Sequence, residues 1–589
     1  MDFSIVATTL EKMEQTSSRI ELTNHLVQLF KNTPSHVLDK VIYLIQGKVG
    51  PDYEGAEMGI AEKMVIRVIS NTTGVSVDRI YQIYQKTGDL GDVANIIMEK
   101  KMQKTLFSEI ITVERIYLTF DKIAKTVGKG SQEAKLLLLS SLFNDSTPNE
   151  SRYITKFALG TLRLGVADNS ILDALSIAFT ADKRKRNVLE SGYNVSGDLG
   201  RVGRLLATDG LSAVASLKIQ LFIPIRPMLA ARVSTAQEAL DKMNGRAAAE
   251  YKIDGERVQI HKGGDKVAIF SRRLENITTY YPDIVDSIKR ISSKKIILEA
   301  EVVAIEENTG ELLPFQELMH RRRKYNLTEA VKKYPVSLNL FDVLYVDGES
   351  KTKLPYTKRR RILESFVGKT NDMMLKIIPQ KIVQHPNQIE DLMSKAIEAG
   401  CEGLMLKQLA SSYRAGAREF AWIKIKREYC SEIADTIDLV VVGALYGRGR
   451  RTGKYGALLL AGYDKDSNLF KSICKVGSGF KDMDLELLWN KIGPYVILRR
   501  HQRVKSTLEM DTWIEPRIVI EIIASEITLS PSYDIGMDAI RTGFGLSLRF
   551  PKFTGKIRFD KNPEDATSES ELISLYKQQL RTIKSRENT

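Results

Sequence analysis

Cysteine is scarce in this chain, with three among 589 residues. They are Cys401, Cys430 and Cys474, an odd and widely spaced set without a CxxC pair. Such a set supports neither a disulfide framework nor a structural zinc site built from cysteine. We therefore expect any metal ion to be held by oxygen ligands.

Long apolar runs are also missing. No segment approaches the roughly 18 consecutive apolar residues of a membrane-spanning helix. The first residues, Met1-Asp2-Phe3-Ser4, lack the basic and then apolar pattern of a signal peptide. These two absences predict a cytoplasmic protein without a membrane anchor.

Charge is the most unbalanced feature of the composition. The formal net charge is +14 and the pI is about 9.3, while a hydrophobic content of 43% is typical of globular proteins. A basic surface favours a polyanionic partner, and we expect nucleic acid rather than a membrane surface.

The pattern of apolar residues changes twice along the chain. Residues 1–215 have helical spacing, and the proline-containing stretch Phe222–Ala230 breaks it. Alternating strand and helix patterns follow within 216–430, and short glycine-broken strand patterns fill much of 431–589. We therefore predict an all-α domain, an α+β domain, and a small β-barrel domain whose tail includes a helix near Leu572–Leu580.

The helical third contains an internal echo. Thr87–Val93 and Ser196–Val202 share the pattern Gly-Asp-Leu-Gly-x-Val, and each places an aspartate where it could cap a following helix. Two similar caps are one explanation. We favour a duplicated helical half, whose two copies could be related by a pseudo-twofold axis that suits a duplex partner.

The octapeptide Glu250–Arg257 places Lys252 between carboxylates and an arginine, at a predicted strand-turn-strand. A lysine can act as a nucleophile when its surroundings favour the neutral amine. The simpler interpretation is a β-hairpin, because Asp254-Gly255 is a strong hairpin-turn signal. The motif is too short to decide between these interpretations.

Further segments downstream contain the residue types that nucleotidyl transfer needs. Phosphoryl chemistry requires cations on the non-bridging oxygens and carboxylates for magnesium. Alternation also predicts that Lys424 and Lys426 share one face of a strand. Each segment alone could be surface charge, but their order along the chain favours a site around Lys252. The segments are Ser271–Arg273, Glu299–Glu301, Glu402–Lys407 and Trp422–Lys426.

This ordered set resembles the covalent nucleotidyltransferase superfamily, and the whole chain resembles the archaeal replicative type of ATP-dependent DNA ligase. Glu250 precedes Lys252 by two residues, as in the first motif, and the ending Arg549–Phe553 with Arg558–Lys561 resembles the last. Arg152–Ile154 and Leu159–Gly165 resemble the helical DNA-binding domain of the larger ligases. The resemblance implies a helical DNA-binding domain (1–215), an adenylation domain (216–430) and an OB-fold domain (431–589).

Residue roles follow from the same resemblance. Lys252 would attack the α-phosphate of ATP, Glu250 would accept a hydrogen bond from the adenine amine, and Phe341 would stack on the purine unless it is a core aromatic. Arg257 and Arg272 would hold ribose and phosphate. The full set of implied nucleotide contacts is Glu250, Arg257, Arg272, Glu301, Phe341, Arg418, Lys424 and Lys426.

Metal, DNA and pyrophosphate contacts are implied as well. Glu301 and Glu402 would bind Mg²⁺ or Mn²⁺, and both could instead form ion pairs. Arg558 and Lys561 would close over the pyrophosphate during the first step. The implied DNA contacts are Arg163, Arg549 and Phe550.

The implied reaction seals nicks in duplex DNA during replication, repair and recombination. AMP would pass from lysine to the 5′-phosphate of the nick, and the 3′-hydroxyl would then displace it. Gln103–Phe107 resembles a sliding-clamp-binding box, and we expect a monomer associated with the nucleoid. The basic runs Lys183–Arg186, Arg321–Lys324 and Lys358–Arg361 could be nuclear localisation signals or solvated faces, and we expect at least one of them to contact phosphate.

Three other functions share part of this sequence pattern. A capping-type RNA guanylyltransferase shares the lysine motif but lacks the helical domain. A non-enzymatic descendant of a ligase predicts decayed motifs, and none is visibly decayed. An NAD-dependent ligase resembles a chain with a four-cysteine zinc module, which this sequence cannot supply.

Overall fold

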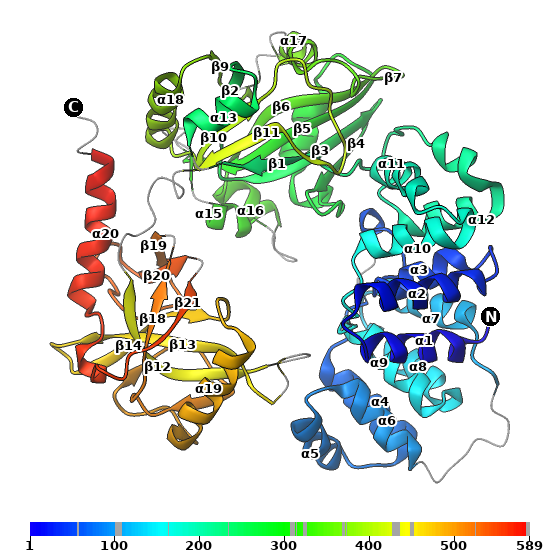
Figure 1. Ribbon diagram of the computed structural model, residues 1–589, viewed down its shortest axis with the longest axis vertical. Helices are drawn as coiled ribbons and strands as arrows, with labels where there is room; N and C mark the ends of the chain where they lie inside the picture. The colour runs from blue at the N-terminus through cyan, green and yellow to red at the C-terminus, as the bar shows by residue number, and fades with distance from the viewer. Residues whose placement is uncertain are drawn as a thin grey trace. The chain divides into compact units, whose positions relative to one another are not determined.

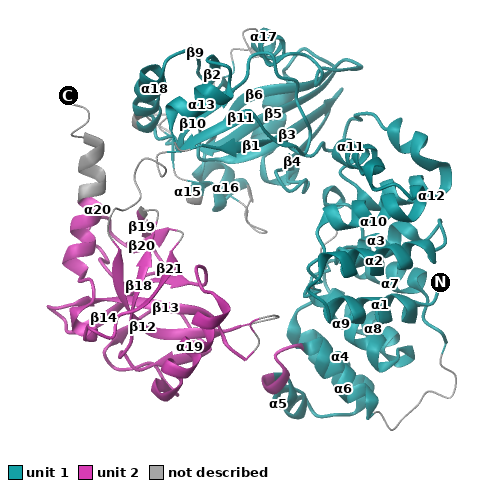
Figure 2. Cartoon of the chain, viewed as in Figure 1, with its two compact units in different colours: residues 1–84, 90–427 teal, residues 85–89, 428–589 magenta. Residues whose placement is uncertain are grey.

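A computed structural model of the chain provides the structure (Figure 1). It describes all residues except 56–57, 101–108, 163, 234, 307–311, 314, 322–326, 368–371, 373, 427–435, 448–450, 452, 525, 550 and 585–589. The chain divides into two compact units (Figure 2). One comprises Met1–Tyr84 with Leu90–Arg427, and the other comprises Gln85–Asp89 with Glu428–Thr589.

The N-terminal third is helical, as predicted. No helix of the described residues is long and apolar enough to cross a membrane. Its α-helices are α1 (Phe3–Glu14), α2 (Arg19–Lys31), α3 (Leu38–Ile45), α4 (Glu62–Thr73), α5 (Val77–Thr87), α6 (Leu90–Glu99), α7 (Val113–Lys125), α8 (Ser131–Asp145), α9 (Pro148–Leu159), α10 (Asp168–Thr180), α11 (Arg186–Ser196) and α12 (Leu199–Ala215).

These helices form two similar halves. α6 begins at Leu90 and α12 at Leu199, and the other helices of α1–α6 have counterparts in the same order in α7–α12. α6 packs on α9 and its counterpart α12 packs on α3, while α4 packs on α8 and α10 on α2. Each half therefore completes the packing of the other, which confirms the predicted duplication.

The starts of the two halves pair reciprocally. The Phe3 N–H donates to the Ile111 carbonyl at 2.8 Å, and the Val113 N–H donates to the Met1 carbonyl at 2.9 Å. This exchange is the pattern that a local twofold axis produces.

The echoed motifs adopt the same conformation in both halves. Gly88 and Gly197 follow α5 and α11 with φ of 69° and 61°, in the left-handed region that favours glycine at a helix end. The Asp198 side chain accepts a hydrogen bond from the Arg201 N–H, which caps α12 as predicted.

The α+β region contains two sheets. The five-stranded sheet has the order β1-β11-β10-β2-β9, and the six-stranded sheet has the order β4-β3-β5-β6-β7 with β8 beside β6. The strands of the first are β1 (Leu229–Arg232), β2 (Ala247–Lys252), β9 (Gln380–Val383), β10 (Gly403–Lys407) and β11 (Arg418–Lys426). Those of the second are β3 (Glu256–Gly263), β4 (Lys266–Ser271), β5 (Lys295–Ala304), β6 (Val336–Val346), β7 (Glu349–Ser350) and β8 (Leu375–Ile377).

Helices accompany both sheets. α17 packs on β6 of the larger sheet, and α18 packs on β2 and β10 of the smaller sheet. They are α13 (Ala236–Lys242), α14 (Pro282–Lys289), α15 (Phe315–Met319), α16 (Leu327–Lys333), α17 (Tyr356–Val367) and α18 (Pro386–Glu398).

The hairpin interpretation of Glu250–Arg257 is wrong. β2 pairs with β10 and β9, whereas β3 pairs with β4 and β5, so the turn at Asp254-Gly255 passes from one sheet to the other. Gly255 permits this crossing, because a Cβ there would lie 2.3 Å from the Val302 carbonyl oxygen of β5.

The proline-containing stretch that precedes β1 is bound to one face of β3. The Phe222 N–H donates to His261 Nδ1 at 2.9 Å, and Gln259 bonds both the N–H and the carbonyl of Ile225 at 2.8 and 3.1 Å. Arg257 Nη1 donates to the Met228 carbonyl at 2.7 Å. Burial lowers the pKa of His261 to about 3, so the ring stays neutral and can accept that hydrogen bond.

The C-terminal region is rich in short strands, as predicted for an OB-fold barrel. β12 pairs with β13, β17 and β18, and β18 also pairs with β21, so the sheet branches and curls. The strands are β12 (Ile437–Tyr446), β13 (Tyr455–Asp464), β14 (Leu469–Val476), β15 (Val496–Ile497), β16 (Val504–Lys505), β17 (Thr512–Ile514), β18 (Val519–Ile523), β19 (Glu526–Ser530), β20 (Gly545–Arg549) and β21 (Lys552–Ile557). The helices are α19 (Asp482–Ile492) and α20 (Glu569–Lys584), and α20 contains the predicted tail helix.

Candidate active site

Lys252 is the last residue of β2 and shares one strand face with Glu250, two residues earlier. The antiparallel neighbour β10 places Gly403 opposite Lys252, and β11 in turn places Lys426 opposite Gly403. Lys424 lies two residues before Lys426 on β11, as the alternation predicted. One face of the smaller sheet therefore presents Lys252, Lys424 and Lys426 side by side.

Glu402 supplies a negative charge beside the lysines of this face. It forms ion pairs with Lys252 and with Lys426, the latter at 3.1 Å. Burial would raise the pKa of Glu402, but the two ammonium groups outweigh burial and hold that pKa at about 2. Glu402 is thus a carboxylate at any physiological pH.

Lys424 has no carboxylate among the groups that dominate its pKa. Burial and the charges of Arg232, Lys252, Lys426 and Arg272 lower the pKa of Lys424 from 10.5 to about 8. The face therefore carries more positive than negative charge, which suits an anionic ligand.

Glu250 lies at the bottom of the same face, 1% exposed. Its carboxylate accepts hydrogen bonds from Tyr356 Oη and from Arg360 Nη1, the latter at 3.2 Å, and pairs with Lys407 Nζ at 2.6 Å. A carboxylate has about four acceptor positions. These three donors therefore leave Glu250 one position for a further donor such as an amine.

The larger sheet contributes the facing group of carboxylates and arginine. Arg257 of β3 lies opposite Glu301 of β5, and its Nη2 pairs with Glu299 Oε2 at 2.8 Å. Tyr413 Oη donates to the other Glu299 oxygen at 2.9 Å. Burial raises the pKa of Glu301 to about 7 against the lowering effects of Lys252 and Arg257. A carboxyl group in that environment would be stabilised by an added cation.

Phe341 lies in the core beside this group and is 7% exposed. Its ring is 6.0 Å from the Trp422 ring, with Lys407 Nζ 4.8 Å and the Arg257 guanidinium 5.4 Å from its centre. The structure thus gives Phe341 the packing of a core aromatic with cations on its faces. Its stacking on a purine remains a prediction.

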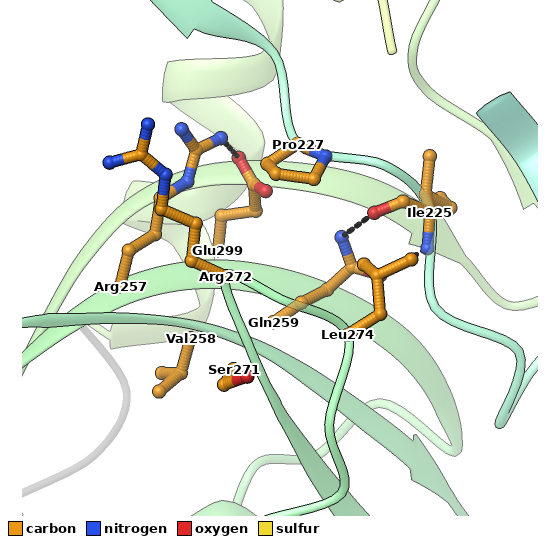
Figure 3. Close-up of a pocket in the computed structure, with 9 residues that line it drawn as sticks. All are labelled: Ile225, Pro227, Arg257, Val258, Gln259, Ser271, Arg272, Leu274 and Glu299. Atoms are coloured by element: carbon orange, nitrogen blue, oxygen red, sulfur yellow. Dashed lines mark hydrogen bonds and ion pairs between the residues drawn. The ribbon is translucent and has the colours of Figure 1, made fainter. Parts of the chain in front are cut away.

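A small pocket adjoins Arg257 and Arg272 (Figure 3). Arg272 follows the last residue of β4 and is exposed, and Glu299 lies between the two arginines and the linker residues Ile225 and Pro227. The remaining lining residues are Val258, Gln259, Ser271 and Leu274.

Comparison with known proteins identifies this arrangement. A model of the ATP dependent DNA ligase domain matches residues 227–426, which contain both sheets. A model of the DNA ligase N terminus matches residues 2–176, and one of the ATP dependent DNA ligase C terminal region matches residues 451–561. A DNA ligase of Nitrosopumilus maritimus is 54% identical over 580 residues, covering 98% of both chains.

The chain belongs to the archaeal-type ATP-dependent DNA ligases. It is therefore an enzyme that uses ATP to seal nicks in duplex DNA, and replication and repair are typical settings of its family. The rival capping-type and non-enzymatic interpretations are set aside by these matches.

Further relatives agree with this assignment. A DNA ligase of Cenarchaeum symbiosum is 50% identical and covers 99% of both chains, and a probable DNA ligase of Persephonella marina is 46% identical over 98% of this chain and 99% of its own. A solved structure described as Pmar-Lig_Pre. has a TM-score of 0.56 at 19% identity, covering 94% of this chain and 99% of that one. At this identity the likeness concerns the fold, and it supports the predicted order of helical, nucleotidyltransferase and OB-fold domains.

The two carboxylates of Glu301 and Glu402 fit a divalent cation that is also bound by phosphate oxygens of the substrate. Among the described residues, no three His, Cys, Asp or Glu side chains lie together as a complete metal site. Glu301 and Glu402 are nevertheless close enough for the charge of Glu402 to raise the pKa of Glu301. Mg²⁺ commonly takes one or two protein carboxylates and completes its shell with phosphate oxygens and water, so the two glutamates suffice.

Of the remaining predicted site residues of the ligase, one belongs to the smaller sheet, three belong to the C-terminal region, and the others lie outside the described residues. Arg418 is the exposed first residue of β11, and Arg549 is the half-buried last residue of β20. Arg558 and Lys561 both pair with Asp438 in the C-terminal region. Arg163, Phe550 and the clamp box at 103–107 lie outside the described residues.

Two of the three basic runs contain structural arginines rather than free cations. Arg321 is fully buried and pairs with Asp283, and Arg359 is fully buried and pairs with Asp342 at 2.7 Å. Neither side chain can reach a phosphate from this position. In the third run, Arg184 is exposed, which leaves phosphate contact there a prediction.

Sequence reasoning missed several residues that complete the ligase site. Glu299 and Lys407 lie in segments that the sequence singled out, but the sequence predicted neither the contacts of Glu299 with Arg257 and Tyr413 nor that of Lys407 with Glu250. No local pattern marks Tyr356, Tyr413 or Arg232, and Arg360 stands out only as part of a basic run, because their roles depend on contacts between distant segments. The missed residues are Arg232, Glu299, Tyr356, Arg360, Lys407 and Tyr413.

Proposed function

We propose that Lys252 is the residue that takes AMP. Its nitrogen forms a bond to the α-phosphorus of ATP and loses its proton, while the bond from that phosphorus to the bridging oxygen breaks and pyrophosphate leaves. The observation that carries this proposal is the strand face that presents Lys252, Lys424 and Lys426, with Glu402 paired to Lys252 and Lys426. It offers a nucleophile and phosphate-binding cations within one rigid sheet.

The neighbouring side chains bind different parts of the nucleotide. Lys424 and Lys426 hold the α-phosphate oxygens, where negative charge is concentrated in the transition state. Arg257 and Arg272 hold ribose and phosphate from the opposite sheet, and Arg418 assists from the start of β11. The open acceptor position of Glu250 receives the adenine amine, which favours adenine over bases that lack that donor.

Phe341 contacts the purine at the base-binding end of the site. Its place between Lys407, Arg257 and Trp422 supports this role by fixing the ring plane.

Glu301 and Glu402 hold Mg²⁺ or Mn²⁺. When bound, that ion neutralises charge on the triphosphate oxygens. The raised pKa of Glu301 supports this role, because burial outweighs the nearby positive charges of Lys252 and Arg257 and an added cation would stabilise the carboxylate.

After adenylation, AMP moves to the 5′-phosphate of the nick and the 3′-hydroxyl displaces it. Arg163, Arg549 and Phe550 contact the duplex in these steps. Arg558 and Lys561 act earlier, when they close over the departing pyrophosphate.

Incubation with α-labelled ATP and Mg²⁺, followed by denaturing electrophoresis, tests the nucleophile. Wild-type protein should retain label and Lys252→Ala should not. Lys381→Ala is the matched control, since Lys381 is an exposed lysine of β9 in the same sheet, paired with Ala249, three residues before Lys252 and on the opposite face of β2. Label that survives Lys252→Ala would refute the proposal.

The organisation of the chain is part of the proposal. We assign residues 1–215 to the DNA-binding domain, 216–430 to the adenylation domain and 431–589 to the OB-fold domain with its helical tail. The enzyme acts as a monomer, binds a sliding clamp through Gln103–Phe107, and works in the cytoplasm at the nucleoid. Clamp binding is checked by replacing Phe107 and measuring retention on an immobilised clamp.

A further inference from the structure

Asp438 is the second residue of β12, and its carboxylate gathers two cations from the end of the chain. Its Oδ2 accepts from Arg558 Nη1 at 2.7 Å and from Lys561 Nζ at 2.7 Å. These are the two residues assigned to pyrophosphate. One oxygen atom of Asp438 therefore joins the two cations, and Glu521 is a second carboxylate near Arg558, with its Oε2 3.9 Å from Arg558 Nη1.

The side chains of Asp438, Arg558 and Lys561 differ in their exposure to solvent. The Asp438 side chain is 8% exposed, whereas those of Arg558 and Lys561 are 24% and 32% exposed. The anion therefore lies beneath two cations whose outer sides reach solvent. An external anion can approach the cations without first removing Asp438.

Both cations keep donors for such an anion. Arg558 directs Nε and Nη2 to Asp560 and Nη1 to Asp438, which engages three of its five N–H groups. Lys561 has three N–H groups and uses one on Asp438. The donors left over can bind phosphate oxygens while the ion pairs persist.

The position of Asp438 is fixed by its own main chain. The Asp438 N–H donates to Thr567 Oγ1 at 3.1 Å, and its carbonyl accepts from the Thr567 N–H at 2.9 Å. β12 also pairs Asp438 with Glu521 of β18. The carboxylate is thus held by the barrel rather than by the flexible ends of the cations.

We propose that Asp438 is a positioning residue for adenylation, which holds Arg558 and Lys561 as a pair with the spacing that pyrophosphate requires. This inference rests on the proposed function, in which these cations serve the first step. It assigns no role to Asp438 in the sealing step, where pyrophosphate is absent.

Asp438→Asn tests the proposal, because it keeps the shape and removes the charge. A charge-assisted hydrogen bond is roughly twice as strong as a neutral one, and we expect adenylation with limiting ATP to slow by roughly tenfold to a hundredfold. The pyrophosphate concentration that half-saturates the reverse reaction should rise with it. Sealing of a nick that already carries 5′-AMP should stay within about threefold of wild type.

Asp464→Asn is the matched control. Asp464 ends β13 in the same region, its side chain is 10% exposed, and it pairs with Lys471 at 2.7 Å. This variant loses a similar ion pair without touching the proposed pyrophosphate residues. Both steps should therefore respond alike in it.

Two outcomes of the Asp438→Asn measurement would overturn the proposal. An equal loss in adenylation and sealing would show a merely structural role, and unchanged or faster adenylation would show that Asp438 does not position the cations. If the variant does not fold, Asp438→Glu is measured in its place, with the same step-selective loss expected and wild-type adenylation as the contrary result. Failure of the proposed function is separate, because it would appear as label on Lys252→Ala.

Discussion

Replacing Lys424 by methionine should stabilise the free enzyme while it impairs adenylation. Methionine keeps the length and apolar stem of lysine and removes a charge that lies among Arg232, Lys252, Lys426 and Arg272. The expected gain in stability follows from the repulsion between Lys424 and these cations. A bound phosphate would offset that repulsion, whereas in the free enzyme it lowers stability. Active sites commonly carry such local instability.

The size of the gain follows from the pKa of Lys424, which falls from 10.5 to about 8. At about 1.4 kcal/mol for each tenfold change in proton affinity, this fall sets a ceiling of about 3 kcal/mol. Solvent screens a half-buried side chain, so we expect about 1 kcal/mol at pH 7. For a domain of roughly 150–250 residues, such as region 216–430, a gain of about 1 kcal/mol raises the melting temperature by roughly 2–4 °C.

The gain should depend on pH in a defined direction. Below pH 8 the folded wild type carries the protonated Lys424 and its full penalty. As pH rises from 8 to 10.5, the folded state has released this proton and the unfolded state still binds it, so wild-type stability increases. The difference between Lys424→Met and wild type should therefore shrink over this window.

Thermal unfolding at pH 7 and at pH 9.5, with α-labelled ATP used to measure adenylation, checks this reasoning. Lys426→Met is the control, because Lys426 pairs with Glu402 at 3.1 Å and its loss should not stabilise the protein. Equal melting temperatures of Lys424→Met and wild type at pH 7 would refute the argument. So would a difference that grows with pH.

Two further substitutions test the framework around the site. Gly255→Ala should destabilise the protein by about 1–3 kcal/mol and slow adenylation, because the new Cβ would lie 2.3 Å from the Val302 oxygen; Gly493→Ala, with open space around its Cβ, is the denaturation control and should change little. Arg359→Met should cost about 3–5 kcal/mol, because it leaves Asp342 charged and buried. In urea titrations the double variant with Asp342→Leu should recover much of that loss, and a loss under about 1 kcal/mol in the single variant would contradict the assignment.

Local sequence patterns predicted the elements well where one signal dominated. The helix expected near Leu572–Leu580 lies within α20, and Lys424 and Lys426 share a strand face as their spacing required. The echoed heptapeptides predicted the duplication, because a helix end, a left-handed glycine and a helix start occupy a fixed span of sequence. Each of these features depends on neighbours close in the chain.

Burial of charge could not be predicted in the same way. The run Lys358–Arg361 has the composition of a solvated face, yet Arg359 is fully buried and Arg360 reaches Glu250. α17 packs on β6 of the larger sheet, where Arg359 pairs with Asp342, whereas the Glu250 that Arg360 contacts belongs to β2 of the smaller sheet. A run of charges carries no information about which partner another segment will supply.

The turn at Asp254-Gly255 shows why the site itself was harder to predict than its residues. A hairpin would have paired β2 with β3 and placed the strands carrying Lys252 and Arg257 next to each other in one sheet. Instead the turn sends the chain to a second sheet, so Lys252 acquires Glu402 from β10's start and Arg257 acquires Glu299 from β5. The short connection keeps the two sheets together at this point, because three intervening residues span only about 10 to 14 Å even when extended. One uninterrupted octapeptide thus supplies Lys252 to one sheet and Arg257 to the other, through the sheet change that its hairpin signal concealed.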